Sequence, residues 1–376
     1  MDKTYQHLGS FSDWVTEANR QQLLYPLAQP GHDTREGVRT LLGFTKDEVT
    51  KDVRLESSWE KDGLYGEELS WSVGYGPRTH AWVLKPLGVT EKLAGIIALH
   101  DHGGFKFYGK EKIADGPREA EPVIAAYRDD AYGGRAFANA LAKEGFVVLV
   151  PDTFLWGSRK FPLSAMPDWI LEATDATGSI WKTDDVPLEI ARYNRATYFH
   201  EFMIEKYCAL LGTTLAGVIS HEDRIAVNYL QTRNDVNPEN TACIGLSGGG
   251  NRAALLQATC DAIKAAVIVG LMSTYEGLLD HNVTSHTWML FPHGWARHGD
   301  WSDLAASRAP SPLLVQYDLE DELFTREGMQ AAHERIASHY KSAGASKNYQ
   351  GEFYPGAHKF DLEMQQAAFA WLKGVT

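Results

Sequence analysis

Short runs of consecutive apolar residues recur through the middle and later parts of the chain. They occupy residues 93–100, 146–151, 241–245, 265–271 and 312–317. A continuous apolar run of this length is typical of a strand that is buried on both faces, as in a parallel sheet. Segments with helical character, such as 133–145 and 326–344, lie between these runs. The alternation predicts βαβ units and an α/β fold with a mostly parallel central sheet and helices on both faces.

The first 90 residues have a different pattern. Helices are predicted from near Ser12 and from near Thr34, because each position offers a capping side chain before a helical stretch. Strand-like segments follow at 53–59, 67–74 and 79–85. We therefore expect an N-terminal helical arm packed on the main domain, and an antiparallel lead-in to the sheet, over residues 1–90. Residues 91–376 then form the main domain.

Two long excursions interrupt the strands of the main domain, at about 155–216 and 273–309. Insertions that follow the carboxyl ends of strands lie over the ligand-binding edge of such a sheet, so we expect them to form a cap. Six of the eleven tryptophans fall in these excursions: Trp156, Trp169, Trp181, Trp288, Trp295 and Trp301. Each of them could simply fill the core of its insertion. As pocket residues we predict Trp156 and Trp288, with Phe105 from the loop after the first parallel strand.

Net charge limits the classes of binding partner that we expect, and cysteine content bears on the cellular compartment. The formal net charge of −13 argues against nucleic acid or an anionic membrane. No apolar run is long enough to span a bilayer, and no signal peptide is visible. The three cysteines, Cys208, Cys243 and Cys260, have neither a disulfide nor a zinc-site spacing. We expect free thiols and a cytoplasmic protein.

The strongest chemical signal is the stretch Cys243-Ile-Gly-Leu-Ser-Gly-Gly-Gly-Asn-Arg252. Ser247 stands between a predicted strand and a predicted helix, inside the pattern Gly-x-Ser-x-Gly. A serine at such a sharp turn is held in a strained conformation, and the turn closes only if its neighbours lack side chains. The helix that follows directs its free N–H groups at the reacting centre. The pattern predicts a nucleophilic serine at a nucleophile elbow.

A serine hydroxyl needs a base, and a serine hydrolase on an α/β sheet carries that histidine after its last strand. His358 is in this position, directly after the predicted strand 349–354. Other histidines downstream of Ser247 fall in the second excursion or on a predicted helix, where surface or packing roles are expected: His281, His286, His293, His298, His333 and His339.

The acid that orients the base should follow the strand at 312–317. We predict Asp321, which lies far enough past the strand end to reach His358. Asp318 is the second choice. Glu276 and Asp280, after the preceding strand, are weaker alternatives.

An acyl-transfer site also needs N–H donors for the oxyanion. Gly248, the residue after the nucleophile, should supply one of them. We predict the second donor to be Gly104, in the loop after the first parallel strand, with Gly103 or Phe105 as alternatives. The pair His100-x-His102 in this loop could instead hold a metal, but no third ligand is evident, so no metal or cofactor is predicted.

These motifs resemble those of the α/β-hydrolase superfamily, and within it the dienelactone-hydrolase-like and acetyl-xylan-esterase-like branch. The matching stretches are Ala98-Leu-His-Asp-His-Gly-Gly104, Gly145-Phe-Val-Val-Leu-Val-Pro-Asp152, Asn194-Arg195 with Leu211-Gly-Thr-Thr-Leu-Ala-Gly217, Ile244-Gly-Leu-Ser-Gly-Gly-Gly250 and Gly356-Ala-His358. The resemblance implies a Ser247, Asp321, His358 triad that hydrolyses an ester. In two respects the chain departs from it. Dienelactone hydrolases have a cysteine nucleophile, and the small residue usual three positions before the acid is here Asp318.

The sequence therefore predicts a serine esterase that cleaves a small-molecule carboxylic ester through an acyl-enzyme on Ser247. A peptidase or amidase with the same triad is the first alternative, because the same chemistry cleaves amides. A hydrolase-fold protein that only binds its ligand is the second.

Overall fold

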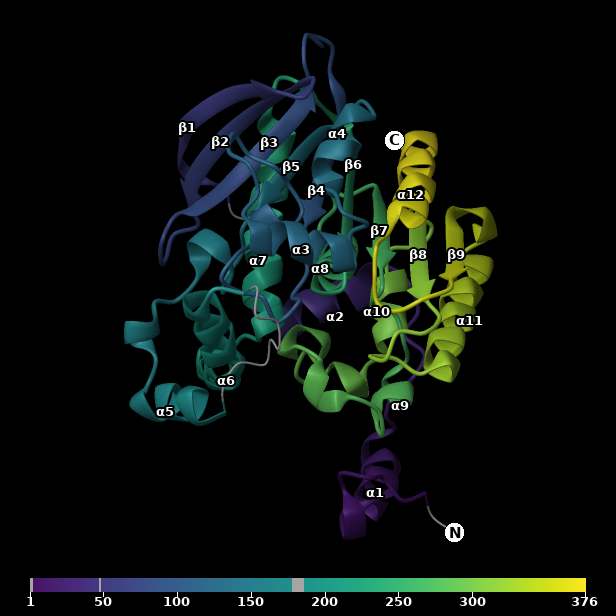
Figure 1. The fold of residues 1–376 in the computed structure, drawn as a ribbon. Coiled ribbons are helices and arrows are strands. Elements are labelled where there is room, and N and C mark those ends of the chain that lie inside the picture. Colours follow the sequence, from purple (N-terminus) through teal and green to yellow (C-terminus); the bar gives the residue numbers. More distant parts are fainter. Residues whose placement is uncertain (1–2, 47–48, 178–185) are drawn as a thin grey trace.

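The computed structural model describes residues 3–46, 49–177 and 186–376. Across these residues a single nine-stranded sheet runs through the molecule in the order β1-β2-β3-β5-β4-β6-β7-β8-β9 (Figure 1). Its strands are β1 Lys51–Lys61, β2 Leu64–Ser72, β3 Thr79–Pro86, β4 Leu93–Leu99, β5 Val147–Pro151, β6 Val236–Leu246, β7 Ala265–Val269, β8 Leu313–Asp318 and β9 Tyr349–Tyr354.

The sheet has an antiparallel part and a parallel part. The strands β1, β2, β3 and β5 pair antiparallel to one another in that order. From β5 through β4, β6, β7, β8 and β9 every pairing is parallel. The mostly parallel α/β sheet predicted from the apolar runs is confirmed, with the antiparallel strands added at its β1 edge.

Helices cover both faces of the sheet. They are α1 Asp13–Gln22, α2 His32–Leu42, α3 Pro122–Ala131, α4 Phe137–Lys143, α5 Asp168–Thr177, α6 Leu188–Leu210, α7 Leu215–Thr232, α8 Gly248–Thr259, α9 Tyr275–Leu278, α10 Trp301–Ala306, α11 Arg326–Ser342 and α12 Leu362–Val375. Alternate residues of β4 enter two different cores, as the period of a strand requires. Ile97 and Leu99 belong to the core cluster that includes side chains of α2, α7, α8, α10 and α11, whereas Ile96 and Ala98 belong to the cluster that includes side chains of α4 and α12.

The two excursions lie at the end of the sheet to which the parallel strands point (Figure 1). The first carries α5 and the long helix α6; part of it, including Trp181, lies outside the described residues. The second is built from α9, α10 and the 3-10 turns Val283–Ser285, Trp288–Leu290 and Trp295–Arg297. Both therefore lie where loops from the strand ends carry the chemistry of an α/β fold.

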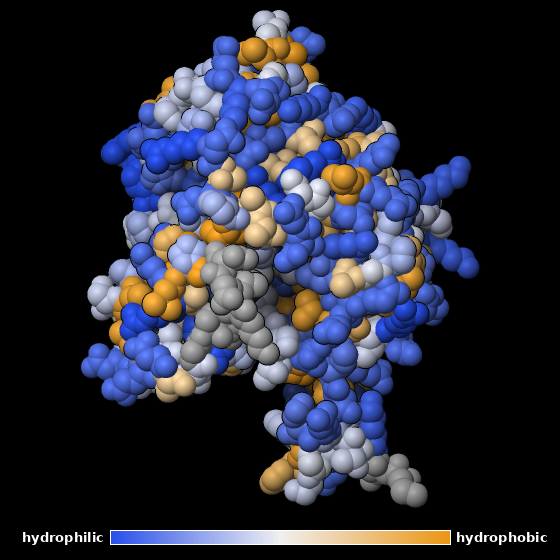
Figure 2. Space-filling model, viewed as in Figure 1, coloured by the Kyte–Doolittle hydropathy of each residue, from blue (hydrophilic) through white to orange (hydrophobic). Residues whose placement is uncertain are grey.

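The N-terminal arm divides into two unlike parts. Helix α2 buries Val38 and Leu42 in the core, as expected for an arm packed on the main domain. Helix α1 has no buried residue and projects from the body of the molecule (Figures 1 and 2). Trp14 in its first turn is largely exposed, as is Phe11 in the 3-10 turn Gly9–Phe11 that precedes the helix. The expectation of a packed arm is therefore met by α2 and not by α1.

None of the helices in the described ranges is by itself both long and apolar enough to cross a membrane. The pair α6 and α7 passes that test of length and composition only when taken together, with a bend of 82° between them.

Candidate active site

Ser247 lies at the turn between β6 and α8. Its backbone has φ 56° and ψ −122°, a left-handed region that residues other than glycine rarely adopt. The Ser247 N–H donates to the carbonyl of Val269, at the end of β7, over 2.8 Å. A strained residue held in place by a neighbouring strand is typical of a functional position.

The glycines around Ser247 are required by close packing. A Cβ atom on Gly245 would lie 2.4 Å from the backbone carbon of Gly249, and a Cβ atom on Gly249 would lie 2.1 Å from the carbonyl oxygen of Leu99. Neither contact is possible for a larger residue without moving the backbone. The steric reason for which the sequence predicted a sharp turn here is thus visible in the structure.

His358 and Asp321 form a close pair beside this turn. His358 Nδ1 lies 2.6 Å from Asp321 Oδ2, and the other oxygen of Asp321 accepts the N–H of Leu323 at 2.9 Å. Burial lowers the pKa of His358, but the hydrogen bond and the charge of Asp321 outweigh it and raise the pKa above its usual value. His358 Nε2 is buried and has no hydrogen-bond partner among the described residues, so it is available to take a proton.

Ser247 and His358, the predicted nucleophile and base, both lie near the end of β7. Gly270 follows Val269, which accepts the Ser247 N–H, and a Cβ atom on Gly270 would lie 3.1 Å from His358 Cε1. The same Cβ atom would lie 3.2 Å from Asp318 Oδ2. The structure therefore brings Ser247, His358 and Asp321 together at the carboxyl ends of the parallel strands. Asp318, the second choice for the acid, lies there as well.

The weaker candidates have other partners. Asp280 accepts the N–H of Gln6 at 2.7 Å. His281 and His286 make hydrogen bonds from the second excursion to the carbonyls of Glu322 and Leu323, at 2.8 and 3.0 Å. These two histidines therefore support the loop that carries Asp321.

The loop after β4 differs from the sequence prediction. The N–H of Gly104, predicted as the second oxyanion donor, donates instead to His102 Nδ1 at 3.0 Å. Gly103 and Gly104 both have positive φ, which turns the chain back onto the histidine ring. A Cβ atom on Gly248 would lie only 2.5 Å from the backbone nitrogen of His102, so the N–H group of His102 adjoins the residue that follows Ser247.

Glu201 of α6 holds this loop from behind. It accepts a hydrogen bond from His102 Nε2 at 2.9 Å and forms a short ion pair with the buried Lys106. Its other oxygen accepts the Thr287 hydroxyl at 2.8 Å and the Trp288 N–H at 3.2 Å. Glu201 thus joins the loop after β4, the first excursion and the second excursion. Glu201 is not among the residues predicted from the sequence, where the only related signal is Lys106, a charged residue between Phe105 and Phe107.

The charges in this cluster are fixed by their partners. Burial raises the pKa of Glu201, but Lys106 and His102 outweigh it and hold the pKa of this carboxyl well below its usual range. Burial lowers the pKa of His102, only partly opposed by Glu201. Since its Nδ1 accepts the Gly104 N–H, His102 is the neutral tautomer with a proton on Nε2.

Of the three predicted pocket residues, two are buried. Phe105 is 3% exposed and packs with Val123, Ile124 and Ile190 in a small cluster. Trp156 is 1% exposed, beside the rings of His100 and His102. This corrects the expectation that they line the pocket, because neither presents a surface to a substrate in this structure.

Trp288, the third predicted pocket residue, is only half-buried. Its ring meets Phe202 edge-on with a centroid separation of 5.9 Å, and Phe202 in turn meets Tyr198 at 5.7 Å. Phe202 and Tyr198 lie on α6 and are exposed. Together the three rings form an aromatic row that joins the two excursions.

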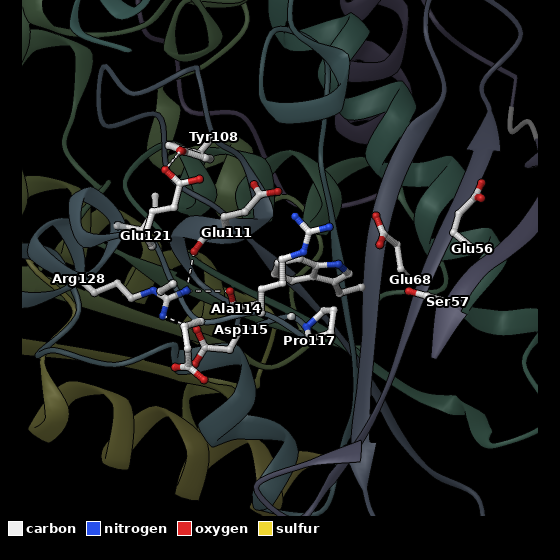
Figure 3. A pocket seen from close by; sticks show the side chains of 16 residues that line it. Glu56, Ser57, Glu68, Tyr108, Glu111, Ala114, Asp115, Pro117, Glu121 and Arg128 are labelled. Atoms are coloured by element: carbon white, nitrogen blue, oxygen red, sulfur yellow. Dashed lines mark hydrogen bonds and ion pairs between the residues drawn. The ribbon is translucent and has the colours of Figure 1, made fainter. Parts of the chain in front are cut away.

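A cavity of about 640 Å³ lies elsewhere, between the β1–β3 strands and the loop before α3 (Figure 3). Its lining includes several acidic side chains, among them Glu56, Glu68, Glu111 and Glu121. The carboxylates are partnered; for example, Glu121 accepts the Tyr108 hydroxyl at 2.6 Å. None of the predicted site residues lines this cavity.

Within the described ranges, one group of three side chains has the composition of a metal site: Asp318, Asp321 and His358, with one nitrogen or oxygen atom of each within 4.8 Å of the others. Two ligands of a tetrahedral metal at usual bond lengths lie about 3.4 Å apart. His358 Nδ1 and Asp321 Oδ2 are closer, at 2.6 Å, which is the distance of a hydrogen bond. The group is therefore better explained as an acid–base cluster.

The fold recurs in solved structures. A proposed acetyl xylan esterase from Bacteroides fragilis matches over 92% of this chain and 82% of its own, with 15% identity and a TM-score of 0.65. A promiscuous CE15 esterase from a marine bacterial metagenome matches over 91% of each chain, with 14% identity and a TM-score of 0.60. The protein has the α/β-hydrolase fold. A glucuronoyl esterase from Solibacter usitatus is similar over 90% of this chain and 91% of its own, with 12% identity and a TM-score of 0.57.

By sequence, the chain is 24% identical over 324 residues to YtaP, a proposed hydrolase of Bacillus subtilis, covering 84% of this chain and 90% of that protein. No family model matches it. In the α/β-hydrolase fold the nucleophile, the acid and the base follow one another along the chain, each after a strand. Ser247 after β6, Asp321 after β8 and His358 after β9 follow that order.

Proposed function

We propose that the protein is a serine hydrolase that cleaves a carboxylic ester through an acyl-enzyme on Ser247. One observation carries this proposal: the strained Ser247 lies at the sheet edge that also holds the hydrogen-bonded pair of His358 and Asp321. The names of the structural neighbours, several of them esterases, support the ester as the bond that is cleaved.

In the proposed reaction, Ser247 Oγ attacks the ester carbonyl while His358 Nε2 takes its proton. Asp321 holds the ring of His358 and stabilises the imidazolium that forms. His358 then returns the proton to the leaving alcohol, and a water molecule hydrolyses the acyl-enzyme by the same route.

For the oxyanion we propose the N–H groups of Gly248 and His102. Gly248 begins α8, where the helix leaves its first N–H groups free. His102 replaces Gly104 in this role because its backbone nitrogen adjoins Gly248, whereas the Gly104 N–H is bonded to the His102 ring. Two backbone N–H groups at fixed positions are what a tetrahedral oxyanion requires.

We further propose a small-molecule ester, including an ester of a carbohydrate, as the substrate. Two of the structural neighbours are named as an acetyl xylan esterase and a glucuronoyl esterase, and these names denote esters of carbohydrates. The aromatic row of Trp288, Phe202 and Tyr198 would offer flat apolar faces beside the cap.

Labelling and turnover test the proposal together. A fluorophosphonate should label the wild-type protein once, at Ser247, and the label should be lost in Ser247→Ala and His358→Ala. Turnover of p-nitrophenyl acetate should fall by at least ~10⁴-fold in Ser247→Ala, as for other serine hydrolases that lose their nucleophile. An unlabelled wild type, or a Ser247→Ala variant with full activity, would contradict the proposal.

A panel of aminoacyl anilides, compared with p-nitrophenyl esters, distinguishes an esterase from the amidase alternative. An esterase should turn over the p-nitrophenyl esters and leave the anilides largely intact, because the amine is a poorer leaving group. Turnover of the anilides alone, with Ser247 still labelled, would show an amidase that uses the same triad.

A further inference from the structure

Two buried carboxylates act on His358. Asp321 makes the direct hydrogen bond, and Asp318, at the end of β8, is 1% exposed and lies within the same 4.8 Å cluster. Asp318 Oδ2 and His358 Cε1 both approach Gly270, lying 3.2 and 3.1 Å from the position that a Cβ atom would take there. Both carboxylates are therefore close enough to His358 to stabilise a positive charge on its ring.

The side chain of Asp318 has few hydrogen-bond partners among the described residues. Its Oδ2 accepts one hydrogen bond, from the Lys359 N–H at 3.2 Å. Its Oδ1 is buried and has no partner among the described residues. A buried carboxylate with one weak hydrogen bond costs stability, so packing alone does not explain an aspartate at this position.

We propose that Asp318 is a second acid for His358, which supports the imidazolium alongside Asp321 and takes over from Asp321 when that residue is removed. The inference rests on the proposed function, in which His358 is the base. Asp318 acts through His358 and does not touch the reacting atoms, so its role is that of a positioning residue.

The charged groups that face Asp318 come from two loops. Asp321 lies on the loop after β8, and His358 and Lys359 lie on the loop after β9; Asp101, after β4, acts on His358. Burial, with a smaller contribution from the charge of Asp321, raises the pKa of Asp318 to about 7 against the opposing effects of Lys359 and His358. When His358 takes the serine proton, its positive charge favours the ionised form of Asp318, which in turn stabilises the imidazolium.

A double-mutant cycle tests whether Asp318 can take over the role of Asp321. Asp318→Asn alone should lower kcat/KM about threefold. In the Asp321→Asn background the same change should lower it by at least ~30-fold, because both carboxylates of the cluster around His358 are then lost. An equal factor in both backgrounds would show independent residues and would overturn the proposal.

Direct titration of His358 gives a readout that does not depend on the substrate. In NMR spectra the pKa of His358 should fall in Asp318→Asn by at least ~0.5 unit, since a negative charge beside the ring is lost. Glu352→Gln on β9 is the matched control, because it removes a carboxylate bonded to Gln316 of β8 and should leave that pKa unchanged. An unshifted His358 in Asp318→Asn would overturn the proposal.

The two proposals can fail separately. Full activity of Ser247→Ala would contradict the serine hydrolase. Ser247-dependent activity, combined with additive effects of Asp318→Asn and Asp321→Asn, would contradict only the second acid. Circular dichroism of each variant establishes that it is folded, and Asp318→Ala serves as a replacement should the asparagine variant fail to fold.

Discussion

Glu201 and Asp318 are both buried carboxylates near Ser247, but their surroundings are opposite. Glu201 accepts hydrogen bonds from His102, Thr287 and Trp288 and pairs with Lys106, so it stays ionised at any physiological pH. Asp318 accepts a single N–H and has a pKa of about 7. A buried charge with a full set of partners fixes structure, whereas one with few partners responds to pH.

The largest expected effect comes from removing the charge of Glu201. In Glu201→Gln the buried Lys106 loses its counter-ion, which should lower the free energy of unfolding by about 3–5 kcal/mol. The loop with His102 should also shift, lowering kcat by about 10–100-fold. Chemical denaturation and steady-state kinetics measure both quantities.

Glu205→Gln is the control for that variant. Glu205 lies one turn further along α6 and accepts the Leu215 N–H at 2.9 Å, away from the loop after β4. Its partner His293 is 55% exposed, so losing this ion pair should cost at most about 1 kcal/mol and leave kcat unchanged. If Glu201→Gln and Glu205→Gln lost equal amounts of stability and of kcat, the partners of Glu201 would have no special effect and the prediction would be wrong.

A smaller effect of opposite sign is expected for Asp318→Asn. The pKa of Asp318 is raised from about 3.9 in the unfolded chain to about 7 in the fold, so the folded state binds the proton more tightly. The stability of the wild type should therefore fall as pH rises from 4 to 7 and then stay level. Asp318→Asn should be more stable than wild type by about 2–4 kcal/mol at pH 8 and nearly equal to it at pH 4. Urea unfolding at the two pH values checks this, and a stability difference independent of pH would contradict it.

The smallest effect concerns His102, which should not titrate near neutral pH. Burial lowers its pKa, and its two nitrogens are occupied by Gly104 and Glu201. Its NMR signals should show the neutral Nε2–H tautomer throughout pH 6–8. If His102 titrated with a midpoint at or above the ordinary histidine value of about 6.5, its assignment as a neutral imidazole beside Glu201 would be wrong.

Local sterics explain why much of the site could be predicted. The elbow at Ser247 needs only its neighbouring glycines, and the position of His358 follows from the order of strands. The fold was equally readable, because strands buried on both faces leave continuous apolar runs in the sequence. Helix α3 was missed, and α4 is shorter than the predicted segment 133–145.

What the sequence did not reveal depends on contacts between distant residues. The direction of the Gly104 N–H depends on the ring of His102, and that ring is held by Glu201, 99 residues later in the chain. Trp156 could fill a pocket or a core by composition alone, and only the packing of the first excursion decides for the core. The elevated pKa of Asp318 likewise follows from burial, which no local pattern encodes.

The glycines of the elbow also limit how this protein could be altered. A side chain at Gly245 would meet the elbow itself, one at Gly249 would meet β4, and one at Gly248 would meet the loop at His102. Each of the three is therefore closed to substitution by a different piece of backbone, and no single exchange relieves another. Directed evolution of a new specificity would have to leave these positions untouched and search the two excursions, where side chains such as Trp288 and Phe202 still have room to change.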